Sequence, residues 1–238
     1  TRTRLDPGAV DRVVLGNVVQ DVQTTNVARE AALAAGFPRQ VPAFTVSMAC
    51  ISSNVAVTTA ADLIRTGQAD VVVAGGTETL SDLPIRFKRK VRRKLFEARK
   101  YRSAADYLKL LRGLRPSDLL PEVPSIAEYS TGETMGESAD KLAAAYGVSR
   151  EAQDEYALRS HHLAAKATAE GLLAGQIVPA AVPPDFEPVT EDNGIRPDTS
   201  MEKLAGLPPA VVEPVGTVTA GNASYLTDRA SAVQLMAR

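Results

Sequence analysis

The first third of the chain alternates between strand-forming and helix-forming segments, and this alternation constrains the fold more than any other feature. Three apolar stretches enriched in β-branched residues are separated by two stretches rich in alanine and other helix formers. We expect strands over residues 10–19, 43–48 and 70–74, and helices over residues 26–35 and 53–66. Strands and helices that alternate at this spacing form βαβ units around a parallel sheet covered on both faces. The pattern therefore predicts an α/β fold.

The remaining two thirds of the chain change to helices and proline-punctuated loops, which indicates an inserted, mainly helical lobe. Helices are expected over residues 136–146 and 149–171, the second with Ser149 as its N-cap. Residues 181–214 are expected to be mostly loop, and residues 230–237 to form one more strand. The predicted domains are the first part of a sheet domain over residues 1–85, the lobe over 86–215, and the return to the sheet domain over 216–238.

The segment 86–115 is strongly basic. It carries thirteen Lys or Arg and two acidic residues, a net charge of +11, so the rest of the chain carries −12 against the whole-chain value of −1. Its apolar residues recur at three- and four-residue steps, which is the spacing of one helix face. We expect one basic amphipathic helix whose apolar face consists of Phe87, Val91, Leu95, Ala98, Tyr101, Ala105, Leu108 and Leu111.

The chain has 238 residues and a single cysteine. One cysteine excludes an internal disulfide and a multi-cysteine zinc site, and no stretch approaches the roughly 18 apolar residues of a membrane span. These features predict no metal site and favour a reduced, cytoplasmic setting. The chain begins without an initiator methionine or a hydrophobic leader, which suggests a processed or excised sequence.

Cys50, the single cysteine, follows the expected strand 43–48 and precedes the expected helix 53–66. A helix N-terminus favours a thiolate, and a strand-to-helix junction holds a nucleophile at the carboxyl edge of a sheet. The alternative is a small buried residue, because free cysteines are among the most buried side chains. Position alone does not decide between them. The small polar residues Ser52, Ser53 and Asn54 suit a site that admits a substrate.

Five motifs follow one another in the order and spacing of a known family. They read SMACISSNVAV, DVVVAGGTETLSDLPIR, MGESADKLAAAYGVSREAQDEYALRSHHLAAKA, DNGIRPD and GTVTAGNASYLTDRASAVQLMA. In these motifs the chain resembles the N-terminal part of the thiolases, the acetyl-CoA C-acyltransferases, and among them the thiolase subunits of fatty acid β-oxidation complexes. The resemblance covers nearly the whole chain. It implies a thiolase-like N-terminal domain with a mixed, mostly parallel sheet and an inserted helical loop lobe.

The resemblance implies that Cys50 is the nucleophile of an acyl transfer. A 3-ketoacyl-CoA would be cleaved by CoA to acetyl-CoA and an acyl-CoA two carbons shorter, through an acyl group held on Cys50. The backbone N–H of Cys50 would donate to the developing oxyanion. CoA would be a co-substrate, with no tightly bound cofactor.

The resemblance also assigns five residues to substrate binding. Ser224 matches a serine that contacts the pantetheine arm of CoA, and Ala220 and Gly221 match the backbone beside it. Arg196 matches an arginine at the nucleotide end of CoA, where a guanidinium suits phosphate or adenine. Met135 matches a residue that lines the acyl pocket. The structural alternatives are a turn residue for Ser224, a solvated loop charge for Arg196 and a core side chain for Met135.

His161 and His162 are the only histidines in the chain, but we do not assign either as the general base. They lie in the middle of an expected helix, whereas the catalytic histidine of the family belongs to a glycine-histidine-proline motif. A solvated helix face is their expected place.

Three catalytic motifs of the family do not occur in the chain: that histidine motif, a second cysteine in a glycine-rich motif, and an asparagine or histidine followed by Glu-Ala-Phe. All three belong to the C-terminal domain of the family. We therefore expect a truncated thiolase that lacks this domain and the first strand, with little thiolysis activity in the chain alone. The alternatives are a non-catalytic thiolase-like protein that binds acyl-CoA or scaffolds a complex, and a condensing ketosynthase.

Several roles stay open for the basic segment 86–115. It is a solvated face, a peripheral contact with an anionic membrane, a docking surface for a partner enzyme, or a source of attraction for the CoA phosphates. The resemblance favours membrane contact and a hydratase–dehydrogenase partner subunit. Nucleic acid is disfavoured, because the segment has no recognised binding motif. The family further implies a homodimer through the sheet domain, and the mitochondrial matrix if the source is eukaryotic.

Overall fold

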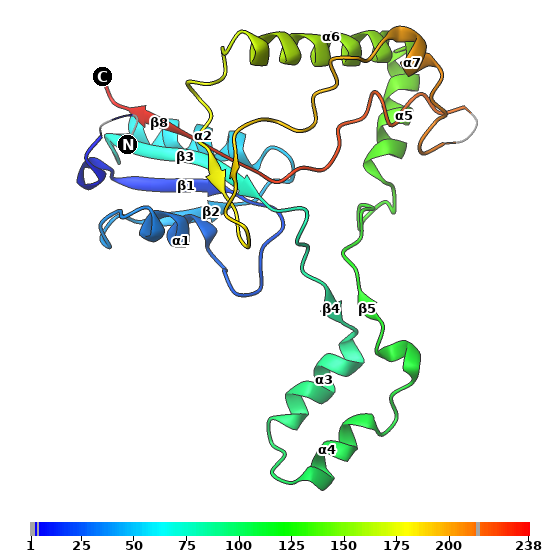
Figure 1. Ribbon diagram of the computed structural model, residues 1–238. Coiled ribbons are helices and arrows are strands. Elements are labelled where there is room, and N and C mark those ends of the chain that lie inside the picture. The colour runs from blue at the N-terminus through cyan, green and yellow to red at the C-terminus, as the bar shows by residue number, and fades with distance from the viewer. Residues whose placement is uncertain (1–2, 4, 213–214) are drawn as a thin grey trace. The chain divides into compact units, whose positions relative to one another are not determined.

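The computed structural model describes residues 3, 5–212 and 215–238 (Figure 1). The chain divides into two compact units, Thr1–Pro124 with Leu226–Arg238, and Ser125–Tyr225. The predicted domain boundaries after residues 85 and 215 stay predictions. Among the described residues, none of the helices is long and apolar enough to cross a membrane.

A four-stranded sheet forms the centre of the first unit. Its strands lie in the order β2-β1-β3-β8, where β1 is Arg12–Gly16, β2 is Ala43–Val46, β3 is Val71–Glu78 and β8 is Arg229–Met236. β1 pairs in parallel with β2 and β3, whereas β8 runs antiparallel to β3. The predicted α/β fold with a mostly parallel sheet is confirmed.

Two helices cover the sheet on opposite faces (Figure 1). Successive side chains of a strand point to opposite faces, so Val13 packs with α1, Val27–Ala34, while Val14 packs with α2, Ser52–Arg65. Both helices present buried alanines to the sheet, which allows close approach of their backbones. The core is therefore two thin apolar layers separated by the strands.

The prediction of one helix over residues 86–115 is wrong. The short strand β4, Arg86–Phe87, leads into α3, Arg89–Ala98, and the chain then reverses into α4, Ala104–Leu111. The return passes through the 3₁₀ turn η2, Pro116–Asp118, to β5, Pro121–Glu122, which pairs with β4. We call β4 to β5 the basic hairpin.

A capping box explains why the helix breaks. The backbone N–H of Asp106 donates to the Ser103 hydroxyl over 3.2 Å, and the N–H of Ser103 donates to the Asp106 carboxylate over 3.3 Å. One aromatic contact joins the two sides of the reversal. The rings of Tyr101 and Tyr107 meet edge to face with centroids 5.7 Å apart.

The second unit is built on α5, Met135–Tyr146, and α6, Arg150–Ala169. Ser149 caps α6 as predicted, because its hydroxyl accepts from the Ala152 N–H over 3.1 Å. The region expected to be mostly loop also contains the short helix α7, Met201–Ala205, and the strand pair of β6, Ala180–Ala181, with β7, Pro188–Val189. Elements this short show no periodicity in a sequence. A short 3₁₀ turn, η1 at Pro7–Ala9, precedes the sheet of the first unit.

Candidate functional site

Cys50 lies on the tight turn between β2 and α2, and its side chain is exposed. The interpretation as a buried cysteine is therefore wrong. The Ser52 hydroxyl closes the turn, since it accepts from the Met48 N–H over 2.8 Å and donates to the Ala49 carbonyl over 2.7 Å. Ala49 has φ +44°, in the left-handed region that side chains other than glycine rarely adopt. A turn held in this way fixes the direction of the thiol.

Two glycines bring this turn to the edge of the sheet. Gly16, the last residue of β1, pairs with Gly76 near the end of the adjacent parallel strand β3. A Cβ on Gly16 would lie 2.5 Å from the Ser53 nitrogen, and one on Gly76 would collide with the Ser53 side chain and lie 2.8 Å from the Gly16 oxygen. Because neither residue has a side chain, the first turn of α2 sits directly on the carboxyl edge. This edge is where open α/β sheets place their ligands.

Two apolar side chains close to Cys50 in the sequence are exposed. Met48 is 53% exposed and Ile51 is 51% exposed. Ser52, one of the small polar residues after Cys50, is buried and supports the turn through its hydroxyl.

Two carboxylates that the sequence reasoning did not single out order the loops at the same edge. Glu78, at the end of β3, accepts from the N–H groups of Val18 and Val19 over 2.9 and 3.0 Å, and from the Asn17 amide over 3.1 Å. Asp228, before β8, accepts from the Ser81 hydroxyl and from the backbone N–H groups of Ser81 and Leu80. These bonds, the Ser81 hydroxyl first, hold the pKa of Asp228 below its usual value. In the sequence, the feature that could have identified these two carboxylates is an acidic residue at the end of an apolar strand or directly before one.

Met135 is the first residue of α5 and is 62% exposed, so the interpretation as a core side chain is wrong. Thr134 caps the helix: its N–H donates to Glu137 over 2.7 Å, and its hydroxyl accepts from the Glu137 N–H over 3.3 Å. The reciprocal cap fixes the start of α5. Met135 is thereby held at an exposed helix N-terminus.

Arg196 is exposed on a loop that both histidines hold. The Arg196 N–H donates to Nδ1 of His161 over 3.2 Å, and Nε2 of His162 lies 3.2 Å from the Thr199 carbonyl. The expectation of a simple solvated face is wrong for His161, which is half-buried beneath the loop. The histidines therefore have a structural task in positioning the loop.

Ala220 and Ser224 are exposed, whereas Gly221 between them is buried. A Cβ on Gly221 would lie 2.5 Å from the Leu204 side chain and 2.6 Å from the Leu207 side chain, so any larger residue there would displace these leucines. The Ser224 hydroxyl makes one long contact, 3.4 Å to the Tyr225 carbonyl, within the part of the chain that the structure describes.

Within the second unit, the two predicted CoA-binding loops are packed together. The Tyr225 ring occupies the space that a side chain on Gly194 would need, so the residue after Ser224 lies against the loop of Arg196. Cys50 belongs to the first unit, and Met135, Arg196, Ala220, Gly221 and Ser224 belong to the second.

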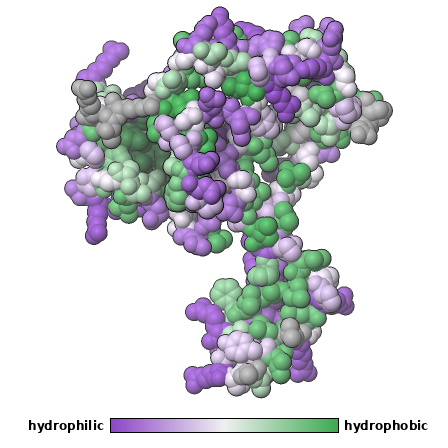
Figure 2. All heavy atoms as spheres, in the orientation of Figure 1, coloured by the Kyte–Doolittle hydropathy of each residue, from purple (hydrophilic) through white to green (hydrophobic). Residues whose placement is uncertain are grey.

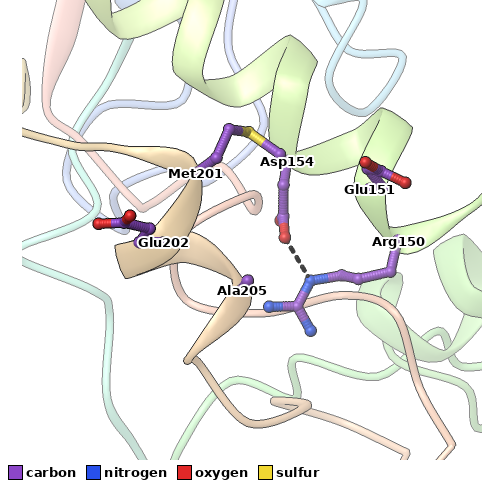
Figure 3. Close-up of a pocket in the computed structure, with 6 residues that line it drawn as sticks. All are labelled: Arg150, Glu151, Asp154, Met201, Glu202 and Ala205. Carbon is purple, nitrogen blue, oxygen red and sulfur yellow. Dashed lines mark hydrogen bonds and ion pairs between the residues drawn. The ribbon is translucent and has the colours of Figure 1, made fainter.

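The second unit also has a cavity of about 490 Å³ between α6 and α7 (Figure 3). Its lining contains none of the predicted site residues; it consists of Arg150, Glu151, Asp154, Met201, Glu202 and Ala205. The most buried polar group, the Asp154 carboxylate, is already paired with the Arg150 guanidinium over 2.7 Å (Figure 3).

Known proteins match the chain over its whole length. It matches the family described as "Thiolase, N-terminal domain" over residues 1–238. The mitochondrial trifunctional enzyme subunit beta of Bos taurus is 56% identical over 236 residues, which cover 99% of the chain and 49% of that protein. The 3-ketoacyl-CoA thiolase of Pectobacterium carotovorum is 44% identical over 235 residues, which cover 99% of the chain and 54% of that protein.

A solved structure matches as well. The acetyl-CoA acetyltransferase of Bacillus anthracis superposes with a TM-score of 0.77 at 37% sequence identity, covering 97% of the chain and 54% of that protein. The chain thus spans about half the length of the relatives it matches.

Proposed function

Because the chain belongs to the thiolase family, we propose that it supplies the nucleophile of an acetyl-CoA C-acyltransferase that cleaves 3-ketoacyl-CoA in fatty acid β-oxidation. The observation that carries the proposal is Cys50, exposed on a closed turn at the carboxyl edge of a parallel sheet, directly before α2. A rigid turn avoids the entropic cost of orienting the sulfur. The relatives named 3-ketoacyl-CoA thiolase support the same chemistry.

The proposed reaction has two transfers. The Cys50 thiol gives up its proton and its sulfur attacks the C3 carbonyl of the 3-ketoacyl-CoA; the C2–C3 bond then breaks, and the acetyl-CoA carbanion takes a proton. The thiol of a second CoA then loses its proton and attacks the acyl thioester on Cys50. The Cys50 sulfur leaves as a thiolate and is reprotonated, and the acyl group departs as the shortened acyl-CoA. The backbone N–H of Cys50 is our candidate donor to the oxyanion of each step.

We propose that residues of the second unit bind the CoA substrates. Ser224 and the backbone of Ala220 and Gly221 contact pantetheine, Arg196 contacts the nucleotide end, and Met135 contacts the acyl chain. Exposure of the Arg196, Ser224 and Met135 side chains supports these roles, as does the packing of the Arg196 and Ser224 loops in one unit.

The test is to trap the acyl-enzyme in the complete gene product. A 3-ketoacyl-CoA supplied without free CoA should add one acyl group, and mass spectrometry should find it on Cys50, the one cysteine of this chain. Cys50→Ala should lower thiolysis at least about a thousandfold. Asp62→Asn, an exposed change on the same helix, is the matched control. Retention of a tenth of the turnover by Cys50→Ala would refute the proposal.

We further propose that the basic hairpin is a peripheral contact with an anionic membrane. Figure 2 shows apolar residues gathered on the visible side of the hairpin, with hydrophilic ones at its margins. Phe87, Phe96 and Leu108 are 52%, 69% and 70% exposed. Such a surface combines apolar insertion with attraction to anionic lipid.

The hairpin suggests which charges to change. Lys88 and Lys94 donate to the carbonyls of Ser117 and Arg112 over 2.6 Å, and Lys90 pairs with Asp118 over 2.7 Å, so these lysines attach the start of the hairpin to η2 and to the residue after α4. Arg89→Gln with Arg93→Gln should therefore weaken co-sedimentation with anionic vesicles and leave the hairpin folded. Neutral vesicles are the control, and unchanged binding of the variant to anionic vesicles would contradict membrane contact.

The proposed partners and location follow the relatives. The trifunctional enzyme relatives are named as subunits of mitochondrial enzymes, which supports a hydratase–dehydrogenase partner and the mitochondrial matrix for a eukaryotic source, or the cytoplasm for a bacterial one. We also propose a homodimer through the sheet domain. The edge strand β8 supports it, because Val233 and Met236 are 52% and 56% exposed.

A further inference from the structure

The segment 217–222, which leads to Ser224, is held by a side chain of its own. The Asn222 carbonyl oxygen accepts from the Thr219 N–H over 2.7 Å, and its amide donates to the Thr217 carbonyl over 3.0 Å. The second amide hydrogen donates to Oδ1 of Asp154 over 2.9 Å. Asn222 therefore folds the segment around itself and attaches it to α6.

Asp154 is buried, and both of its carboxylate oxygens accept hydrogen bonds. It is 1% exposed, and its second oxygen accepts from Nε of Arg150 over 2.7 Å. The same guanidinium donates through Nη2 to the carbonyls of Leu204 and Leu207, over 2.6 and 3.1 Å, and so connects α6 to α7. These two leucines are also the side chains against which Gly221 packs.

We infer that Arg150, Asp154 and Asn222 form a positioning network that sets the stretch from Ala220 to Ser224 in the conformation that binds the pantetheine arm of CoA. The inference rests on the proposed role of Ser224 and goes beyond it, because none of the three residues would touch the substrate. The buried Asp154 carboxylate fixes the orientation of its two partners, because it accepts hydrogen bonds from a guanidinium on one side and from an amide on the other. Exposed loop residues have no such fixed orientation of their own.

The network is distinct from a general contribution to stability. Asp140 of α5 grips the start of the same segment, accepting from the Thr217 and Val218 N–H groups over 2.7 and 3.0 Å. Loss of Asn222 thus leaves one end of the segment attached and frees the end next to Ser224. A positioning role raises KM for CoA, whereas a loss of folded protein lowers the apparent kcat and leaves KM unchanged.

The test uses Asn222→Ala in the complete gene product, with Glu155→Gln, an exposed change on α6, as the control. Amide exchange at residues 217–224 should accelerate about tenfold or more, and KM for CoA should rise about tenfold with kcat changed less than about threefold. The control should change neither. Unchanged exchange in 217–224, or an unchanged KM with kcat lowered, would overturn the inference.

Swapping the two side chains tests the direction of the hydrogen bond between Asn222 and Asp154. Asn222→Asp alone places two carboxylates side by side. It should have the largest effect on KM for CoA and on amide exchange at residues 217–224. Adding Asp154→Asn restores one donor and one acceptor, and should recover more than half of both effects; no recovery would count against the network. If the unaltered gene product shows no thiolysis, the proposed function fails, whereas the exchange measurement still decides whether the network orders the segment.

Discussion

At the scale of single residues, the position of Cys50 depends on two glycines, which have no side chain. Gly16 and Gly76 leave room for Ser53, and Ala49 adopts a positive φ that the Ser52 hydroxyl stabilises. A backbone held in a sparsely populated conformation needs such support, since it costs about 1–2 kcal/mol per residue. The reactive turn therefore depends on close approach of α2 to the strands.

Gly76→Ala should disturb this approach. The new methyl would meet the Ser53 side chain and the Gly16 carbonyl, so we expect a loss of about 1–3 kcal/mol in the free energy of unfolding and a fall in thiolysis. Urea unfolding and steady-state turnover measure the two effects. Gly175→Ala is the control, because a Cβ there meets open space. Equal effects of the two changes would show that close packing at Gly76 is not required.

At the scale of elements, helix starts are set by local hydrogen bonds that a sequence displays. Ser149 was predicted as a cap from its position, and the Ser103–Asp106 box, which follows the same rule, decides that the basic segment is two helices. The apolar spacing alone suggested one helix. A capping signal inside a periodic stretch therefore deserves more weight than the period.

Ser103→Ala tests this reading of the hairpin. Loss of the cap should destabilise the start of α4 by about 1 kcal/mol and accelerate amide exchange at residues 105–107. Ser138→Ala, in the exposed first half of α5, should have little effect on exchange in its own helix. Protection at 105–107 that survives the loss of Ser103 would show that another contact starts the helix.

Asp140 couples the second unit to pH. Burial would raise the pKa of Asp140, but hydrogen bonds from Thr217 and Val218 outweigh burial and hold that pKa below its usual value. A carboxyl whose folded pKa is lowered contributes stability that is present above its unfolded pKa, about 3.9, and lost as pH falls through the folded pKa. The stability of residues 125–225 should therefore decline below about pH 4.

Asp140→Asn should flatten this part of the curve of unfolding free energy against pH, measured by denaturant titration between about pH 2 and 6. Glu155→Gln, also in the second unit, provides the comparison, since it removes an exposed carboxyl that holds no segment. An unchanged slope in Asp140→Asn would assign the acid sensitivity to other groups.

At the scale of the whole molecule, each of the two units contains hydrogen bonds between its own segments. Asp228 connects to Leu80 and Ser81 in the first unit, and Arg150 connects to Asp154 and Leu204 in the second. Each pair of partners is far apart in sequence, except Arg150 with Asp154. The two units should therefore respond separately to loss of these residues.

Arg150→Ala should lower the stability of the second unit by about 3 kcal/mol, because it leaves the buried Asp154 carboxylate without its cation. Asp228→Asn should instead accelerate amide exchange at residues 80–81 of the first unit. Exchange measured peptide by peptide on both variants distinguishes the units. Equal acceleration in both units by either variant would mean that they unfold together.

Local patterns in the sequence determined the sheet strands, the helices α1, α2, α5 and α6, and the junction that carries Cys50. These features depend on neighbours a few residues away, through periodicity, capping and glycine ends. The motifs likewise indicated the family and the candidate residues, because the order and spacing of motifs can be recognised without knowledge of the contacts in the fold.

Only the tertiary structure decided which candidates are exposed and what supports them. Cys50 is exposed, Ser52 is buried beneath it, and His161 holds the loop of Arg196. Asp154 meets Asn222 although 68 positions separate them, and Asp228 meets Leu80 across 148. Burial and hydrogen-bond partners depend on segments far apart in the chain, which no local pattern specifies. The sequence determined the strand-to-helix junction at Cys50; the fold decided how the backbone around it is held.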